Sequence, residues 1–185
     1  RIKDIWDSKW LTNMGEQHEA LEAKLKEELK AENLALFSNG TLALFIALKA
    51  LGLSGEVITT PFTFPATVQV LDWSGLTPVF CDIDPDTLCI DARKIEDLIS
   101  EKTSAILGVH VFGIPCEVEA IDAIASKFGL KVVYDGAHAF KTKVNNVPIS
   151  AFGDMVMFSF HATKLFNTIE GGALAVKDGS LLPTV

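Results

Sequence analysis

Short apolar runs alternate along the chain with longer segments in which apolar residues recur at helical spacing. Seven runs of four to eight residues, most of them rich in β-branched side chains, predict buried strands. They cover residues 34–37, 56–60, 77–82, 104–111, 131–135, 154–160 and 172–176. Between most of them lie helical patterns, at residues 41–51, 66–73, 91–100 and 117–128, and another precedes the first strand at residues 16–31. The last of these carries Leu21, Leu25 and Leu29 at intervals of four, with charged residues between them, as an amphipathic helix does.

This alternation predicts an α/β fold. Strand, helix and strand at this spacing require a largely parallel sheet covered by helices on both faces, which makes three layers. About a dozen residues join the last two strands, too few for a packed crossover helix, so we expect the seventh strand to run antiparallel.

Charge and cysteine content limit the classes of binding partner and the compartment that we expect. The formal net charge is -8 and lysines and arginines form no long run, so we expect neither nucleic acid nor an anionic membrane as a partner. The three cysteines, Cys81, Cys89 and Cys116, lie on apolar stretches without a C-x-x-C pair. Buried thiols in a reducing compartment are therefore expected rather than disulfides or metal ligands, and we expect a cytoplasmic protein.

In a parallel sheet, ligands bind at the loops that leave the carboxyl ends of the strands. The first such loop contains Ser-Asn-Gly-Thr, at residues 38–41, and opens a helix. Gly40 and Thr41 could hold an anion there, although serine and asparagine are also ordinary helix caps. Neither G-x-x-x-x-G-K-[ST] nor G-x-G-x-x-G occurs, which disfavours a plain nucleotide-binding domain.

Two further loops carry candidates. Phe62 and Phe64 lie between two prolines after the second strand, where an aromatic ring either faces the space above the strands or packs into the core. Asp135 ends a buried strand and needs a cation or hydrogen-bond donors as partners. His138 could contact the same ligand or a nearby backbone carbonyl.

A lysine completes the set. Lys164 follows an apolar run, in the segment Ser-Phe-His-Ala-Thr-Lys, and precedes a double glycine. An anion loop, an aromatic ring, a buried carboxylate and a loop lysine, each at the end of a different strand, are what pyridoxal phosphate requires. Its aldehyde takes a lysine amine, its ring nitrogen a carboxylate, its ring a flat face and its phosphate amides and hydroxyls.

The segments SNGTLAL, PFTFPATV, TPVFCDIDPDT, YDGAHA and SFHATKLFNTIEGGA resemble the DegT/DnrJ/StrS-type sugar aminotransferases, fold-type I enzymes that use pyridoxal phosphate. The resemblance covers nearly the whole chain. It implies Lys164 as the Schiff-base lysine, Asp135 on the pyridine nitrogen and His138 near the ring hydroxyl. It also implies that the cofactor ring stacks on Phe64. The residues that would hold the phosphate are Gly40, Thr41 and Ser159.

The resemblance further implies the reaction. An amino group, from L-glutamate, would pass to a keto group of a nucleotide-linked deoxysugar of the dTDP type, at position 4 or position 3. Some relatives carry histidine in place of the lysine and act as sugar dehydratases, so Lys164 favours transamination. Family members are homodimers of roughly twice this length. Residues 1–185 would then be the cofactor-binding large domain, with an N-terminal segment and helix at 1–33 and the sheet and its helices at 34–176, and the smaller C-terminal domain would lie outside them.

Two other classes stay open at this point. One is another pyridoxal phosphate enzyme of the same fold, such as a lyase, a dehydratase or an amino-acid aminotransferase. The other is a non-catalytic regulatory protein that keeps the fold and binds the cofactor.

Overall fold

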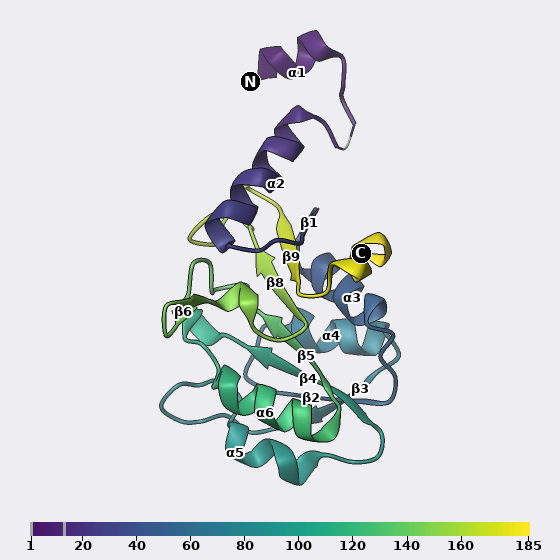
Figure 1. Ribbon diagram of the computed structural model, residues 1–185, viewed down its shortest axis with the longest axis vertical. Coiled ribbons are helices and arrows are strands. Elements are labelled where there is room, and N and C mark those ends of the chain that lie inside the picture. The colour runs from purple at the N-terminus through teal and green to yellow at the C-terminus, as the bar shows by residue number, and fades with distance from the viewer. Residues whose placement is uncertain (1, 13) are drawn as a thin grey trace.

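The computed structural model describes residues 2–12 and 14–185 and has α/β architecture (Figure 1). Its strands are β1 (Leu34–Phe37), β2 (Glu56–Thr59), β3 (Thr77–Phe80), β4 (Thr103–Val109), β5 (Lys131–Asp135), β6 (Lys143–Val144), β7 (Val147–Pro148), β8 (Met155–Ser159) and β9 (Gly172–Val176). Its α-helices are α1 (Ile2–Ser8), α2 (Glu16–Leu29), α3 (Gly40–Ala50), α4 (Pro65–Trp73), α5 (Ala92–Ile95) and α6 (Val118–Phe128). Four short 3-10 helices are η1 (Glu96–Leu98), η2 (Val111–Gly113), η3 (Ile149–Ala151) and η4 (Gly179–Thr184).

Seven strands form one sheet in the order β1-β9-β8-β5-β4-β2-β3. The pairings that link β8, β5, β4, β2 and β3 are parallel, whereas β9 pairs antiparallel with both β1 and β8. The prediction of a mostly parallel sheet with an antiparallel seventh strand is therefore confirmed. Because β9 is reversed, β1 runs with the parallel strands, and the carboxyl ends of β1, β2, β4, β5 and β8 meet at one edge.

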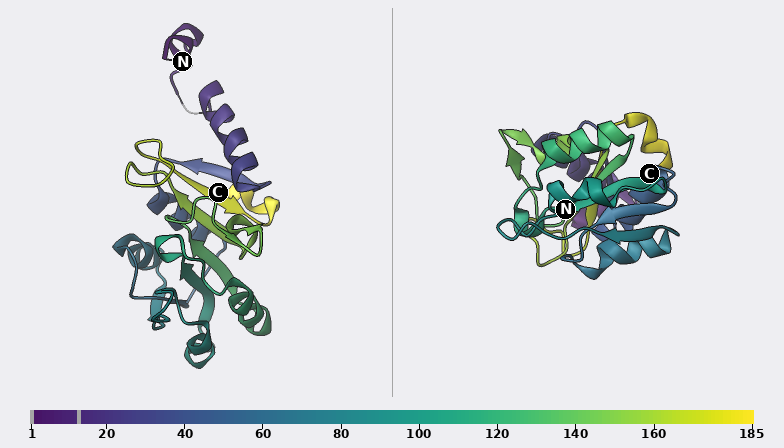
Figure 2. Two further views of the ribbon diagram at one scale, coloured as in Figure 1. Left: turned by 90° about the vertical axis from the view of Figure 1, so that its left-hand side faces the viewer. Right: turned by 90° about the horizontal axis from the view of Figure 1, so that it is seen from below.

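Helices cover both faces of the sheet (Figure 2). Alternate residues of β5 enter opposite cores: Tyr134 belongs to the core that contains residues of α2, α5 and α6, and its neighbour Val133 to the core that contains residues of α3 and α4. The alternation holds in β8 also, where Phe158 enters the first core and Met157 the second. This period of two is the strand period, so central strands such as β5 and β8 are apolar on both sides and buried, whereas the edge strand β3 is partly exposed.

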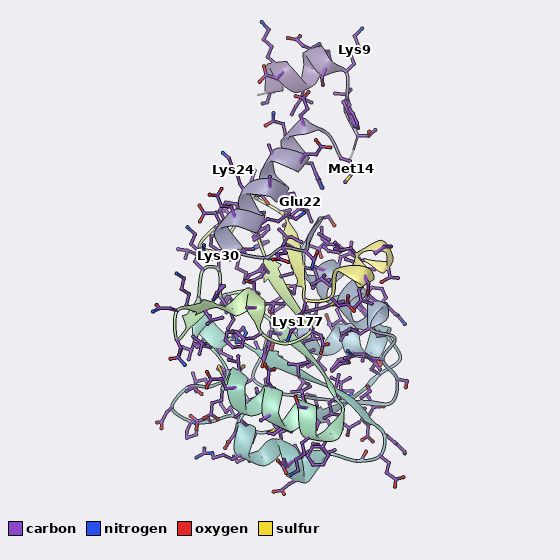
Figure 3. All side chains as sticks on the ribbon, in the orientation of Figure 1. Lys9, Met14, Glu22, Lys24, Lys30 and Lys177 are labelled. Carbon is purple, nitrogen blue, oxygen red and sulfur yellow. The ribbon has the colours of Figure 1, made fainter. Side chains whose placement is uncertain are left out.

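The projecting N-terminal part contains α1 and α2, which extend away from the sheet (Figure 1). Leu25 and Leu29 of α2 are buried against the first core, and charged residues such as Glu22 and Lys24 cover much of the remaining helix (Figure 3). The amphipathic helix predicted at 16–31 is confirmed. No helix in the described parts of the chain has the length and apolar character needed to cross a bilayer.

The structure differs from the sequence prediction in a few elements. The helix expected at 91–100 is shorter, since Asp91 caps the single turn of α5 and the chain then tightens into η1. Helix α1 and the hairpin of β6 and β7 were not predicted. The hairpin strands have two residues each, too few for a hydrophobic period, and Asn145 and Asn146 supply its turn with φ of 50° and 66°.

The cysteines follow the prediction. Cys81, Cys89 and Cys116 are buried free thiols.

Candidate active site

The carboxyl ends of the parallel strands surround a hollow of about 460 Å³. All seven assigned residues line it, and they lie at or after the carboxyl ends of four strands, β1, β2, β5 and β8: Gly40, Thr41, Phe64, Asp135, His138, Ser159 and Lys164. The structure thus gathers these residues at one place. Their individual roles stay predictions.

The start of α3 forms a cradle against the end of β8. Asn39 caps the helix, its Oδ1 accepting a hydrogen bond from a first-turn amide at 2.8 Å. A Cβ at Gly40 would lie 2.9 Å from Met157 Sδ and 3.1 Å from Ser159 Cβ, so glycine lets the helix start this close to Ser159. The first amides of a helix lack intrahelical acceptors and form its positive end. Together with the Thr41 and Ser159 side chains they suit a phosphate.

The carboxyl of Asp135 lies at the end of β5, 6% exposed. Its Oδ2 accepts a hydrogen bond from Thr67 Oγ1 at 2.7 Å, and its Oδ1 accepts one from the amide of Ala137 at 3.0 Å. Thr67 is held in turn by Thr63, their hydroxyls 2.7 Å apart. Both direct partners of the carboxyl are neutral, and burial raises its pKa. A cationic ring nitrogen beside this carboxyl would stabilise its ionised form.

Lys164 lies in the loop that joins β8 to β9. The ends of this loop are hydrogen-bonded together, because Phe160 donates its amide to Gly171 O at 2.8 Å and accepts from the Thr168 amide at 2.9 Å. Within the loop, the Lys164 amide donates to His161 O at 2.9 Å. The lysine is half-buried and held on a tight turn at the rim of the hollow.

Side chains anchor the loop on both sides of the lysine. The ring of Phe166 stacks on Phe140 with centroids 4.9 Å apart and meets Phe160 edge-on at 5.1 Å. His161 Nε2 lies 3.6 Å from Glu170 Oε1. These contacts position the backbone around Lys164 without using its amine.

Two rings stand near the lysine. Phe64 caps α4 and is 74% exposed, so the core-packing alternative is wrong for this residue. His138 stacks on Phe112 with centroids 6.0 Å apart and an interplanar angle of 12°. Burial and the Lys164 charge lower the pKa of His138, which keeps the imidazole neutral near neutral pH.

The sequence prediction missed three contributors. Thr67 donates to Asp135 across 68 positions of the chain, a separation over which no sequence pattern reports a contact. The pair of His161 and Glu170 flanks the lysine in the segment already singled out, and two polar side chains on one short loop were the available sign. Phe112 lies three residues after β4 and directly after the strand predicted at residues 104–111, so its place at a strand end could have nominated it.

The residues present fit pyridoxal phosphate. The Gly40 cradle would admit a phosphate, the buried Asp135 carboxyl lacks a cation among its direct partners, and Lys164 lines the same hollow. The fold and this donor set are those of pyridoxal phosphate aminotransferases. The chain belongs to the DegT/DnrJ/EryC1/StrS aminotransferase family, whose model matches residues 1–185.

Curated relatives agree with this. The chain is 52% identical over 173 residues to the dTDP-4-amino-4,6-dideoxy-D-glucose transaminase of Shigella dysenteriae, covering 94% of this chain and 47% of the relative. It is 49% identical over 180 residues to the Escherichia coli enzyme of the same name, covering 96% and 48%. The chain therefore spans about half the length of the curated relatives it matches.

Solved structures share the fold closely. DesI, solved in the presence of its TDP-sugar product, superposes with a TM-score of 0.95 at 38% identity, covering 99% of this chain and 47% of DesI. NtdA from Bacillus subtilis, solved with bound cofactor PMP, gives a TM-score of 0.92 at 31% identity, with coverages of 99% and 42%. Pyridoxal phosphate is thus the cofactor of the family to which this chain belongs.

Proposed function

We propose that the whole protein transfers an amino group, from L-glutamate, to the keto carbon at position 4 of a dTDP-linked 6-deoxysugar. The observation that carries this is one hollow that combines the Lys164 amine, the buried Asp135 carboxyl and the Gly40 cradle. The substrate follows from the two transaminases that are 52% and 49% identical to this chain. Position 3 is the alternative carbon.

When bound, pyridoxal phosphate supplies an aldehyde that captures amines and a ring that accepts electrons. Asp135 would hold the proton on the ring nitrogen. At about 4 Å and an effective dielectric constant near 20, such a charge pair contributes about 4 kcal/mol, or about three pK units. Thr67 and Ala137 fix the carboxyl in the required orientation. Asp135→Asn should keep the fold and slow transamination severely.

Lys164 would hold the cofactor covalently and, once freed by the donor amine, move the proton that transamination requires. Its turn in the β8–β9 loop limits where the amine can reach. His138, neutral because burial lowers its pKa, would contact the ring hydroxyl as a hydrogen-bonding group. The amides and side chains of the cradle would bind the phosphate, and the exposed ring of Phe64 would cover one face of the cofactor.

The proposal extends to the assembly. Residues 1–185 are the large domain, and the rest of the enzyme and a second subunit of a homodimer complete the substrate site. The length of the relatives supports the first statement, since this chain covers 47% and 48% of them. A cytoplasmic enzyme is consistent with three buried free thiols.

The alternative functions differ from the proposed one in the residue at position 164 or in the substrate. A sugar dehydratase of the family would carry histidine where this chain has Lys164. An amino-acid aminotransferase or a regulatory homologue would keep the lysine, so only an assay separates them from the proposal.

The assay uses the full-length protein with pyridoxal phosphate, L-glutamate and a panel of dTDP-linked 4-keto and 3-keto 6-deoxysugars. Mass spectrometry and NMR then identify any aminosugar and the carbon that bears nitrogen. We expect amination at position 4, abolished in Lys164→Ala and retained in Lys143→Ala as a matched control. Turnover of amino acids without any sugar product would refute the substrate, and bound cofactor without any transfer would favour the regulatory class.

A further inference from the structure

A second hollow, of about 390 Å³, adjoins the cofactor hollow. The two share four lining residues, Ala137, His138, Thr163 and Lys164. The lysine therefore borders both spaces, one with the buried carboxyl and the anion cradle, the other without them.

The walls that belong to the second hollow alone are apolar. They are the side chains of Phe112, Phe140 and Leu165. The ring of Phe140 stacks on that of Phe166, whereas Leu165 is 88% exposed and Phe112 69% exposed. Exposed apolar side chains gathered beside a reactive group indicate a ligand that covers them.

Phe112 is held in an unusual way for an exposed residue. Its backbone has φ of 53° and ψ of 19°, the left-handed region that favours glycine. Its ring is nearly parallel to that of His138, with centroids 6.0 Å apart, and nearly perpendicular to that of Phe62, with centroids 6.4 Å apart. The next residue, Gly113, has φ of 86° and passes so close to His138 that a Cβ there would lie 2.9 Å from its carbonyl oxygen.

Residues of three strand-end loops thus hold the Phe112 ring in the hollow that Lys164 also lines, at the cost of a strained backbone. Strain of this kind persists where the surrounding structure imposes it, and it is concentrated at ligand sites. Folding alone gains little from a ring that stays 69% exposed.

We propose that Phe112 is the platform on which the pyranose ring of the acceptor sugar stacks, with Leu165 and Phe140 against the deoxy carbon. This rests on the proposed function. The carbon that receives nitrogen must come within reach of Lys164, and the second hollow is the space that borders this lysine outside the cofactor hollow. A phenyl face carries negative potential and attracts the polarised C–H bonds of a sugar. The sugar, rather than the nucleobase, is the occupant because the base is separated from the reacting carbon by the diphosphate.

The test measures binding to the full-length, cofactor-loaded protein by calorimetry, with dTDP-4-amino-4,6-dideoxy-D-glucose and with dTDP as probes. Phe112→Ala should weaken binding of the sugar nucleotide about tenfold and leave binding of dTDP unchanged. Phe112→Gly removes the ring while accepting a φ of 53° without strain, so it tests the same point in a backbone that is free to fold. Phe112→Tyr keeps a ring and should bind nearly as the wild type does.

Phe128→Ala is the matched control. Phe128 is 41% exposed at the end of α6, three residues before β5 begins and so near the opposite edge of the sheet. It should change neither affinity. Saturation-transfer NMR adds a second readout, in which sugar protons should receive more magnetisation from aromatic side chains than the thymine methyl does, and should lose it in Phe112→Gly.

If Phe112→Gly weakened the binding of both probes equally, or of neither, the proposed role of Phe112 would be wrong, while the transaminase proposal would remain in place. Failure of the wild-type protein to bind the sugar nucleotide would instead overturn the proposed function, and the platform with it.

Discussion

Gly172 sets the position of the proposed phosphate cradle from the strand that lies between β1 and β8. It begins β9 between two registered neighbours, Phe37 of β1 and Ser159 of β8. A Cβ on this residue would lie 2.6 Å from Asn39 C, 2.7 Å from Gly40 N and 2.8 Å from Asn39 O. All three atoms are backbone, and they belong to the turn that opens α3.

The Gly172→Ala substitution should therefore displace that turn. Ordinary contact begins at 3.4 Å, so the Asn39 carbonyl carbon must retreat by about 3.4 − 2.6 = 0.8 Å. Strand β9 is paired on both sides and resists movement, which leaves α3 to shift. Overpacking of this kind costs about 1–3 kcal/mol of folding free energy. Misplacement of a binding group by about 1 Å can cost about 100-fold, so we expect cofactor affinity to fall about 10- to 100-fold.

The assay is spectroscopic titration of the full-length, cofactor-free protein with pyridoxal phosphate and with pyridoxal. Pyridoxal has no phosphate, so its weaker binding should change much less, and the ratio of the two affinities should fall. Gly15→Ala serves as a control, since a Cβ there would lie 3.6 Å from its nearest neighbour, Trp10 Cδ1. Wild-type affinity for pyridoxal phosphate in a folded Gly172→Ala protein would refute the reasoning that β9 fixes the cradle.

Three further predictions concern the lysine, the carboxyl and the domain. Borohydride reduction of the cofactor-loaded protein, followed by peptide mass mapping, should place a pyridoxyl group on Lys164; a label on Lys141 or Lys143 instead would contradict its role. In cofactor-free protein, burial holds the pKa of Asp135 above that of an aspartate in water. The folded state therefore keeps a proton that the unfolded chain releases as pH rises, and stability falls between the two pKa values. Asp135→Asn should abolish this fall and be the more stable protein near neutral pH, as denaturant titrations at several pH values can check; an unchanged pH dependence would show that the carboxyl is not its source. A polypeptide of residues 1–185 alone should self-associate and fail to aminate the sugar, because groups that orient a large substrate supply much of the rate. Aminosugar formation by that polypeptide at the full-length rate would count against the assignment as one domain of a larger enzyme.

The strands and the residues at their ends were accessible from the sequence. Buried parallel strands are apolar on both faces, so each appears as a compact run of apolar residues, and polar residues that follow such a run lie at a strand end. This is why Asp135 and Lys164 could be nominated for one site before any contact between their strands was known. The short loop before β9 likewise allowed its antiparallel direction to be predicted.

What surrounds those residues depends on contacts that local sequence does not encode. Strand β9 is inserted between β1 and β8, which brings Gly172 against Asn39. Thr67, in the first turn of α4, lies within hydrogen-bond distance of Asp135 at the end of β5. The short hairpin of β6 and β7 and the ring of Phe112 beside His138 are decided in the same way. The local sequence pattern determines which segments are buried, because burial depends on the polarity of neighbouring residues. The packing of the whole chain decides which buried segments meet, and it therefore determines the partners of each functional side chain.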